Sequence, residues 1–364
     1  MYETVLRVAV LSWRAPGDPD AGGSELHASE ILSRWTAEGV EVTVYARTAP
    51  DGTVLGRGCP FEVVPVGSTY SVFAAASARV WSRRRSFDAV VEILNGVPFW
   101  SPLWWRGPRV AWLHHLHTEM WSQSLPQPFA GIGRWNELSV VPRVYRSTPV
   151  VTLAEPGRTE LLRAGFGRVE VVEPGVDERF TPGGSGRSGP PRLVAVGRLA
   201  PVKRWFELLK AVEPLASRPG GPCLDLVGDG PEREAIEQWA RRRGAEWLTV
   251  HGRVEDSALV DLYRSASLVV SASSAEGWGM TITEAARCGV PAAVTDVLGH
   301  RAAVIDRVTG ELAAQPSDLT AAIARILDDE SRRSRYGRAA MERANEMTWD
   351  RAAARHLELL LEQR

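Results

Sequence analysis

The feature that most constrains the fold is a repeated alternation of short apolar runs with amphipathic stretches of helical period. A short apolar run closed by a turn is typical of a buried strand, and the helical stretch after it is typical of a crossover between parallel strands. Such βα units predict an α/β fold with parallel sheets. The predicted strands are Val5–Leu11, Val40–Ala46, Phe61–Val66, Asp88–Leu94, Arg109–Leu113, Val150–Leu153 and Arg168–Val172, then Arg192–Val196, Leu224–Val227, Leu248–Val250, Leu268–Ser271 and Pro291–Thr295.

Helical stretches follow most of these strands. The last part of the chain reads as helical from about Ser317, with a break near Asn345–Thr348. The other predicted helices are Glu25–Glu38, Ser71–Arg84, Arg134–Arg146, Glu155–Ala164, Lys203–Ala216, Glu232–Arg243, Asp256–Ser265 and Thr283–Cys288.

A glycine- and proline-rich stretch, Pro182–Pro191, interrupts the pattern and cannot bury a face, so we interpret it as the linker where two domains meet. The 364 residues suffice for two cores. The order of elements predicts two Rossmann-like domains facing each other across a cleft, with ligands at the carboxyl ends of the strands. We expect the domains at residues 1–175 and 176–345, followed by a C-terminal helix at 346–364.

Composition excludes several classes of protein. The chain has 43 basic and 44 acidic residues, a net charge of -1, which does not favour a nucleic-acid partner. Cys59, Cys223 and Cys288 lie far apart without a metal-ligand spacing, which fits a reducing cytoplasm and indicates neither disulfides nor a zinc site. Arg7 interrupts the first apolar stretch, which argues against a signal peptide, and no apolar run reaches the ~18 residues of a membrane helix.

The most informative segment, Ser271–Ala285, follows a predicted strand and opens a helix. Gly277 and Gly279 allow backbone conformations closed to other residues, and a helix start near Thr281 offers free N–H groups to a diphosphate. Glu276 on the loop is a candidate for binding sugar hydroxyls, and Glu284 in the first turn is a candidate for ribose hydroxyls. The alternative is a surface turn with two solvated glutamates.

A diphosphate also needs cations. Arg198 comes directly after a predicted strand, and Lys203 lies at the start of the next helix. Fixed positive charges at these positions would neutralise the charge that builds on a leaving diphosphate, as a divalent metal does elsewhere. A single such cation is more often only solvated.

Gly197-Arg198-Leu199 with Lys203, and Glu276 with Glu284 in an E-x7-E arrangement, resemble glycosyltransferase family 4. The segments Val227–Pro231 and His251–Val254 extend the resemblance over most of the chain. It implies a GT-B fold, a nucleotide-sugar-binding C-terminal domain, an acceptor-binding N-terminal domain, a last helix that crosses back, and retention of the anomeric configuration. It assigns the diphosphate to Arg198 and Lys203, the sugar to Glu276 and the ribose to Glu284. The further donor-binding candidates are Arg253, Val254, Gly277, Trp278, Gly279, Met280 and Thr281.

Glycines also precede the first predicted helix, in the segment Asp18–Glu25. The segment resembles the family's glycine-rich loop, which closes over the donor phosphates and the acceptor. Gly22 and Gly23 would let backbone amides approach an anion, and we expect Ser24 to cap the helix on the acceptor side. The alternative is an ordinary βα turn.

Three histidines, His114, His115 and His117, follow the fifth predicted strand. A metal site is not expected, because neither a HExxH helix nor a distant ligand cluster accompanies them. The resemblance implies a histidine near the donor sugar at this strand end. His114 is the first candidate for this catalytic position and His117, on the acceptor side, is the second; the sequence does not settle the register.

The tryptophan-rich segment Phe99–Arg106 lies near Arg83-Arg84-Arg85 in the predicted order of strands. Aromatic rings beside arginines suit a lipid-linked acceptor at a membrane surface, so we expect a cytoplasmic protein with possible peripheral contact at the inner face of the membrane. Burial in the first core is the alternative for most of these rings. Trp349 resembles an aromatic residue of the family near the crossing of the last helix.

The motifs and the resemblance together predict a metal-independent glycosyltransferase with no cofactor. The resemblance implies that it is retaining and that its donor is a UDP- or GDP-sugar, and we expect the acceptor to be a saccharide, a glycolipid or a small natural product. A retaining hydrolase would need two carboxyl groups about 5–5.5 Å apart across the sugar, and Glu284 is expected at the ribose. A dehydrogenase would need G-x-G-x-x-G after the first strand, where Gly22-Gly23 lacks this spacing. A nucleotide-sugar epimerase and a non-catalytic sugar-nucleotide binding protein stay open.

Overall fold

The structure, a computed structural model, describes residues 5–19, 21–118, 121, 125–183 and 189–363. They form two compact units: Met1–Gly175 together with Trp349–Arg364, and Val176–Thr348. The change from one unit to the other lies between Gly175 and Val176, where the expected ranges 1–175 and 176–345 also meet, and ahead of the stretch Pro182–Pro191 that we interpreted as the linker. That stretch belongs to the second unit, and its residues 184–188 lie outside the described residues.

The first unit contains a seven-stranded sheet in which every pair of neighbouring strands is parallel, in the order β3-β2-β1-β4-β5-β6-β7. All five residues of β4 are buried, as expected where helices cover both faces of a parallel sheet. The strands are β1 (Arg7–Leu11), β2 (Glu41–Ala46), β3 (Glu62–Pro65), β4 (Ala89–Ile93), β5 (Arg109–Trp112), β6 (Val150–Thr152) and β7 (Val169–Val171).

The helices of the first unit connect these strands, except for the last, which returns from the end of the chain. They are α1 (Gly23–Ala37), α2 (Val72–Ser82), the short turn η1 (Arg84–Ser86), α3 (Ser101–Trp104), α5 (Phe129–Trp135), the π-helical turn η2 (Asn136–Val140), α6 (Val141–Val144), α7 (Glu155–Ala164) and α15 (Trp349–Leu361).

The second unit contains a six-stranded parallel sheet in the order β10-β9-β8-β11-β12-β13. Its strands are β8 (Arg192–Val196), β9 (Cys223–Val227), β10 (Leu248–Gly252), β11 (Leu268–Ser271), β12 (Ala292–Thr295) and β13 (Gly310–Ala313). Its helices are η3 (Pro201–Lys203), α8 (Trp205–Ala216), α9 (Arg233–Arg243), α10 (Asp256–Ser265), α11 (Met280–Arg287), α12 (Leu298–Ala303), η4 (Pro316–Asp318), α13 (Leu319–Leu327) and α14 (Glu330–Asn345).

In both sheets the chain first adds strands on one side and then returns to the other side of the first strand. The order therefore reverses between β1 and β4 in the first unit and between β8 and β11 in the second. At each reversal, the loops that leave the carboxyl ends of the two neighbouring strands run in opposite directions. In doubly wound sheets such a place is a crevice suited to a ligand. The loops after β1, β4, β8 and β11 are thus the places to look for a site.

The predicted α/β class with parallel sheets in two Rossmann-like domains is confirmed, but some elements were missed and one predicted helix is wrong. Strand β13 and helix α12 were not predicted. Gly310, in β13, lies so close to β12 that an added Cβ would be 2.3 Å from the carbonyl oxygen of Ala292. The packing therefore requires glycine, a residue that weakens a strand, which is why β13 was not recognised from the sequence. The single helix predicted over Arg134–Arg146 is interrupted by the π-helical turn.

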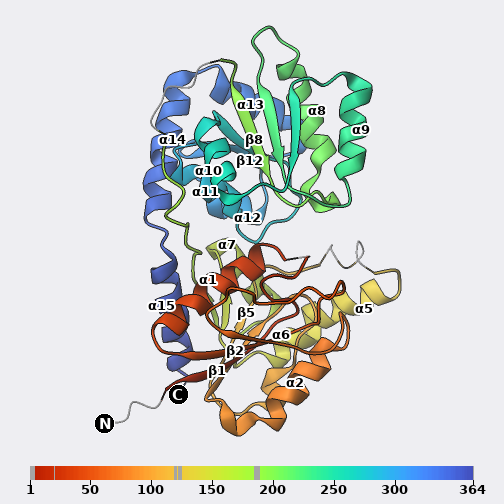
Figure 1. The fold of residues 1–364 in the computed structure, drawn as a ribbon, viewed down its shortest axis with the longest axis vertical. Coiled ribbons are helices and arrows are strands. Elements are labelled where there is room, and N and C mark those ends of the chain that lie inside the picture. Colours follow the sequence, from red (N-terminus) through yellow and green to blue (C-terminus); the bar gives the residue numbers. More distant parts are fainter. Residues whose placement is uncertain (1–4, 20, 119–120, 122–124, 184–188, 364) are drawn as a thin grey trace. The chain divides into compact units, whose positions relative to one another are not determined.

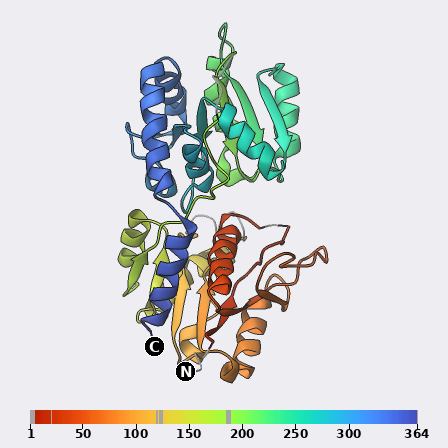
Figure 2. The same ribbon diagram turned by 60° about the vertical axis from the view of Figure 1, so that its left-hand side comes forward.

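Helix α15 packs beside α1 in the first unit, as both views show (Figures 1 and 2). The indole N–H of Trp35 on α1 donates to the backbone carbonyl of Ala353 at 2.9 Å. Behind this bond the rings of His27 and His356 are fully buried, with centroids 5.2 Å apart. The last helix is therefore part of the first unit's core.

Burial makes these two histidines a source of pH dependence. It lowers the pKa of His356 to about 3, with a smaller contribution from His114, and it lowers the pKa of His27 well below its usual value. In the unfolded chain the pKa of a histidine is about 6.5. Between these values the unfolded state binds protons that the folded state does not, so the free energy of unfolding decreases as the pH falls below about 6.5.

We expect His356→Gln to reduce this pH dependence. From pH 7 to pH 5 the wild-type chain should lose about 2 kcal/mol more in its free energy of unfolding than the variant loses, because one histidine no longer takes up a proton on unfolding. Urea unfolding at several pH values measures this difference. His251→Gln, at a half-buried histidine of the second unit, is the control, and equal pH dependence in wild type and His356→Gln would contradict the prediction.

Candidate functional site

The predicted donor residues gather at the point of strand reversal in the second unit. The loop after β8 carries Arg198 and leads into η3, and the loop after β11 carries Glu276 and leads into α11. Ser274 ties the two together, since its backbone N–H and its hydroxyl both donate to the carbonyl of Val202, at 2.8 and 3.0 Å. The structure thus brings Lys203 and Glu276 side by side, although 73 positions separate them.

Lys203 and Glu276 form an ion pair between Nζ and Oε1, and their side chains are 20% and 18% exposed. The hydroxyl of Ser273 donates to the same Oε1 at 2.8 Å. Burial alone would raise the pKa of Glu276, but the charge of Lys203, with smaller contributions from His300 and Ser273, outweighs it and lowers this pKa. Glu276 is therefore an anion at neutral pH and accepts hydrogen bonds.

The position of Lys203 depends on the turn that precedes it. Gly197 has φ of +158°, and an added Cβ there would lie 3.2 Å from Cε of Lys203. The turn after β9 also comes against this backbone, because an added Cβ at Gly228 would lie 1.9 Å from the carbonyl oxygen of Gly197. Only glycine fits this close approach of two main chains, which accounts for the predicted glycine motifs at both strand ends.

The first turn of α12 forms another side of the site, which was not predicted. An added Cβ at Gly299 would lie 2.5 Å from the carbonyl oxygen of Glu276. The next residue, His300, is fully buried; its Nδ1 lies 2.7 Å from the carbonyl oxygen of Thr295, and its Nε2 has no hydrogen-bond partner among the described residues. A Gly-His pair shortly after β12 was the signal in the sequence, visible only once this edge of the sheet is known to carry the site.

Helix α11 begins without a side-chain cap. Its N-cap residue, Gly279, has φ of +105°. The first amides of a helix have no partner within it, so those of Met280 and Thr281 are suited to an anion, with the positive end of the helix dipole behind them. The ring of Trp278 is buried beside Gly277, and its indole N–H has no hydrogen-bond partner among the described residues.

Glu284 is the fifth residue of α11 and lies in its second turn, because the helix begins earlier than Thr283. The phenol of Tyr263 donates to its Oε2 at 2.9 Å. Burial raises the pKa of Glu284 to about 7, and the hydrogen bond from Tyr263 and the charge of Arg179 only partly oppose this. At neutral pH this carboxyl group is therefore present in both protonation states.

The remaining donor candidates lie at neighbouring strand ends. Arg198 is exposed, and its backbone carbonyl accepts a hydrogen bond from the indole of Trp205 at 3.1 Å. Arg253 is exposed and Val254 half-buried directly after β10, the strand on the far side of β9. These residues lie on the same edge of the sheet as Lys203, because all strands are parallel.

In the first unit, the loop after β1 is held by a buried ion pair that sequence reasoning missed. Asp18 accepts two hydrogen bonds from Arg47, at 2.8 and 2.7 Å, and both side chains are nearly inaccessible. The prediction that Ser24 caps α1 is wrong. Gly22 is the N-cap residue, and Gly23 is the first residue of the helix. The backbone N–H of Gly22 donates to the carboxylate of Glu25 at 2.8 Å, and this bond needs no side chain at the N-cap.

The three histidines after β5 have different surroundings. The ring of His114 is 8% exposed and packs on His27, with centroids 4.9 Å apart, while its carbonyl accepts from Thr152 at 3.4 Å. His115 stacks on His117, with centroids 4.8 Å apart. His117 is 18% exposed and lies beside the buried carboxylate of Glu137, which was not predicted. Glu119, which closes the predicted segment, lies outside the described residues.

In the described part of the chain, no cluster of three or more histidine, cysteine, aspartate or glutamate side chains has the arrangement of a metal site. The helices of this part are all too short or too polar to span a membrane.

Known families and proteins match both units. The family "Glycosyltransferase Family 4" matches residues 21–180, and "Glycosyl transferases group 1" matches residues 177–343. D-inositol 3-phosphate glycosyltransferase 2 of Catenulispora acidiphila is 28% identical over 96% of this chain and 93% of its own. Sucrose-phosphate synthase of Thermosynechococcus elongatus has a TM-score of 0.79 at 20% identity, and each chain is 98% covered. Anabaena HepE, solved with UDP and glucose, has a TM-score of 0.77 at 19% identity, covering 98% of this chain and 100% of HepE.

We expect Gly299→Ala to lower the free energy of unfolding by about 1–3 kcal/mol, because the added methyl group must displace the backbone at Glu276. Urea unfolding measures the effect. Gly131→Ala is the matched control. Gly131 lies in α5, and its added methyl group would meet only the flexible end of the Gln127 side chain, which precedes the helix. Equal stabilities of the two variants would show that the contact between Gly299 and Glu276 is not close.

Proposed function

Because the chain belongs to glycosyltransferase family 4, we propose that it transfers a sugar from a UDP-sugar to an acceptor hydroxyl with retention of the anomeric configuration and without a metal. The observation that carries the proposal is the ion pair of Lys203 and Glu276 at the point of strand reversal, beside the open amino end of α11. It places a cation, an anion and free amides within one small region.

Each of these groups suits one part of a nucleotide sugar. The amides of α11 and the cations of Arg198 and Lys203 suit the diphosphate. Glu276, held as an anion, accepts hydrogen bonds from sugar hydroxyls. Glu284, whose pKa is about 7, both donates and accepts, which suits a ribose diol. The complex of HepE with UDP and glucose supports uridine over guanosine as the base.

In the proposed reaction the bond between the anomeric carbon and the diphosphate breaks first. The acceptor oxygen then attacks the same face of the sugar, and the departing phosphate oxygen takes the proton of the acceptor hydroxyl. Lys203 and Arg198 stabilise the charge on the leaving group, the role that a metal ion has in other enzymes. Glu276 is not the nucleophile in this scheme, since Lys203 and Ser273 already hold its carboxylate.

The acceptor is proposed from the relatives alone. Those at 27–29% identity are named as D-inositol 3-phosphate glycosyltransferases, which makes this phosphorylated polyol the first acceptor to test. Saccharides, glycolipid precursors and small natural products complete the panel.

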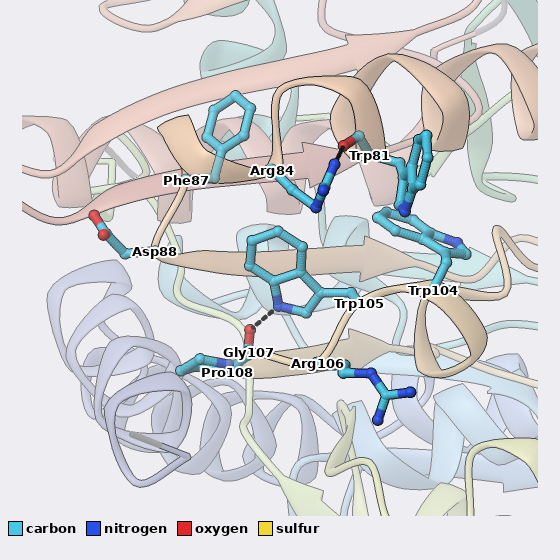
Figure 3. Close-up of a pocket in the computed structure, with 9 residues that line it drawn as sticks. All are labelled: Trp81, Arg84, Phe87, Asp88, Trp104, Trp105, Arg106, Gly107 and Pro108. Carbon is cyan, nitrogen blue, oxygen red and sulfur yellow. Dashed lines mark hydrogen bonds between the residues drawn. The ribbon is translucent and has the colours of Figure 1, made fainter.

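We also propose that the first unit touches anionic membranes through a surface at the amino ends of β4 and β5. A cavity of about 770 Å³ lies there (Figure 3), and its aromatic walls include Trp81, Trp104 and Trp105. The guanidinium of Arg84 lies 4.9 Å from the centroid of the Trp81 ring, which is 52% exposed.

Arg85 and Arg106 are exposed and make no ion pair with any described residue. Exposed aromatic rings and unpaired arginines together suit an anionic lipid surface. The full lining is Trp81, Arg84, Phe87, Asp88, Trp104, Trp105, Arg106, Gly107 and Pro108.

We expect Lys203→Ala to lower the rate of nucleotide release from the sugar donor about 100-fold or more, because a charge that stabilises the leaving group is lost. The measurement is UDP release from UDP-sugars with the acceptor panel present, in EDTA, with circular dichroism to verify folding. Lys210→Ala, an exposed lysine of α8, is the matched control and should react like wild type.

Several results would contradict the proposed function. Turnover of Lys203→Ala near that of wild type would remove Lys203 from the site, and activity lost in EDTA would indicate a metal. Altered donor sugar without acceptor would indicate an epimerase. A thermal-shift screen of UDP, GDP, dTDP and ADP identifies the base, since a ligand at 100 times its Kd adds about 2.7 kcal/mol of stability; binding without release would indicate a non-catalytic protein.

For the membrane surface, we expect the chain to co-sediment with vesicles of 30 mol% phosphatidylglycerol in phosphatidylcholine, about tenfold more weakly after Trp81→Ala or Arg84→Glu, and more weakly in high salt. Trp135→Ala is the matched control, because Trp135 on α5 is also an exposed tryptophan, at 62% against 52% for Trp81. A loss of binding in Trp135→Ala but not in Trp81→Ala would move the contact to α5 and contradict the proposed surface.

A further inference from the structure

The carboxylate of Glu137 lies beside the histidines that follow β5, and no motif had pointed to it. Glu137 belongs to the π-helical turn between α5 and α6, and its side chain is only 4% exposed. Single π-helical turns are frequent at functional sites, because the extra residue changes the direction of one side chain. Pro142, which has no N–H to donate, follows within a few residues and disturbs the regular helical bonds.

Glu137 contacts His117 at two points. Oε1 accepts the backbone N–H of His117 at 2.8 Å, and it lies 3.3 Å from Nδ1 of the ring, an ion-pair contact that does not have the geometry of a hydrogen bond. The other oxygen, Oε2, accepts the indole N–H of Trp121 at 2.9 Å. Burial opposes the charge, but the bonds and charge of His117 outweigh it and lower the pKa of Glu137. The carboxylate of Glu137 is thus ionised, and each of its two oxygens accepts a hydrogen bond.

An ionised carboxylate next to Nδ1 selects one tautomer of a neutral imidazole. In that tautomer Nδ1 carries the proton on the side of the ring that faces Glu137, and Nε2 keeps its lone pair and accepts hydrogen bonds. Nδ1 is buried while the His117 side chain as a whole is 18% exposed, so the accessible part of the ring lies away from Glu137. Nε2 forms no hydrogen bond and no ion pair with any described residue.

The place of His117 suits an acceptor. It follows β5, the strand beside β4, so it lies at the carboxyl edge of the sheet next to the point of strand reversal. An added Cβ at Gly96, in the loop after β4, would come within 3.8 Å of its ring. His114, by contrast, has its ring buried against His27.

We propose that Glu137 is a positioning residue, which holds His117 in the tautomer whose Nε2 accepts a hydrogen bond from an acceptor hydroxyl. This proposal rests on the proposed function, because it takes the first unit as the side that binds the acceptor. Neither residue takes the proton of the reaction, which passes to the leaving diphosphate. The dyad thus orients a hydroxyl-bearing acceptor.

The test compares Glu137→Gln with Glu160→Gln. Both remove one carboxylate, and Glu160 is close enough to Glu137 for the two charges to repel, whereas the hydrogen bond and the ion pair of His117 are formed with Glu137. Long-range ¹H–¹⁵N NMR of histidine-labelled protein reports the tautomer, and His117→Gln assigns the signal. We expect the Nδ1–H tautomer in wild type and in Glu160→Gln, and a shift toward Nε2–H in Glu137→Gln. At metal-bound histidines, loss of the orienting partner costs about 10–100-fold in affinity or activity. We expect the KM for the acceptor to rise by about the same factor in Glu137→Gln, while UDP release without acceptor stays unchanged.

The outcomes separate this proposal from the proposed function. A wild-type His117 with the Nε2–H tautomer overturns it, as does an acceptor KM of Glu137→Gln within twofold of that of Glu160→Gln. If no acceptor of the panel reacts and no UDP-sugar is turned over, the proposed function fails, and the tautomer alone then decides whether Glu137 positions His117. An equal rise of KM for donor and acceptor would indicate a merely structural role and also overturn it.

Discussion

Both units depend on one constraint, the parallel pairing of every strand in their sheets. Parallel neighbours cannot be joined by a tight turn, so each connection crosses a face of the sheet and returns, and all carboxyl ends collect on one edge. Where the strand order reverses, two loops leave in opposite directions and no helix fills the space between them. Lys203 and Glu276 meet at that place, although no local feature of the sequence relates them.

What the sequence predicts well follows from periodicity. Apart from β13, the strands of both sheets are recovered within a few residues, because buried parallel strands are continuous apolar runs. The glycines at Gly197, Gly228 and Gly279 could be predicted because each occupies a strongly constrained backbone position. The contacts of Gly299 and Glu137 could not, since they arise only when α12 and the π-helical turn are packed against a distant loop. The prediction for Ser24 failed for a local reason: the helix begins one residue earlier, at Gly23, with Gly22 as its N-cap, and the backbone N–H of Gly22 donates to the carboxylate of Glu25.

Three buried carboxylates share a mode of stabilisation. Asp18 is paired with Arg47, Glu276 with Lys203, and Glu137 accepts hydrogen bonds from the backbone of His117 and from Trp121. A buried ion pair contributes little net stability, but removing one partner costs about 3–5 kcal/mol, because the remaining charge stays buried. Such groups therefore fix the geometry of the loops that carry them. All three lie in segments that follow the carboxyl ends of strands, where the ligand sites of this fold type occur.

Glu276 and Glu284 belong to one short segment and yet acquire opposite properties. Both are removed from water, which by itself raises the pKa of each. Lys203 reverses this effect at Glu276, whereas the phenol of Tyr263 is uncharged and leaves the pKa of Glu284 at about 7. Glu276 is thus restricted to accepting hydrogen bonds, while Glu284 can donate as well as accept. The E-x7-E spacing is the same for any pair of glutamates, so the difference in protonation between the two carboxyl groups comes from Lys203 and Tyr263, which the spacing does not include.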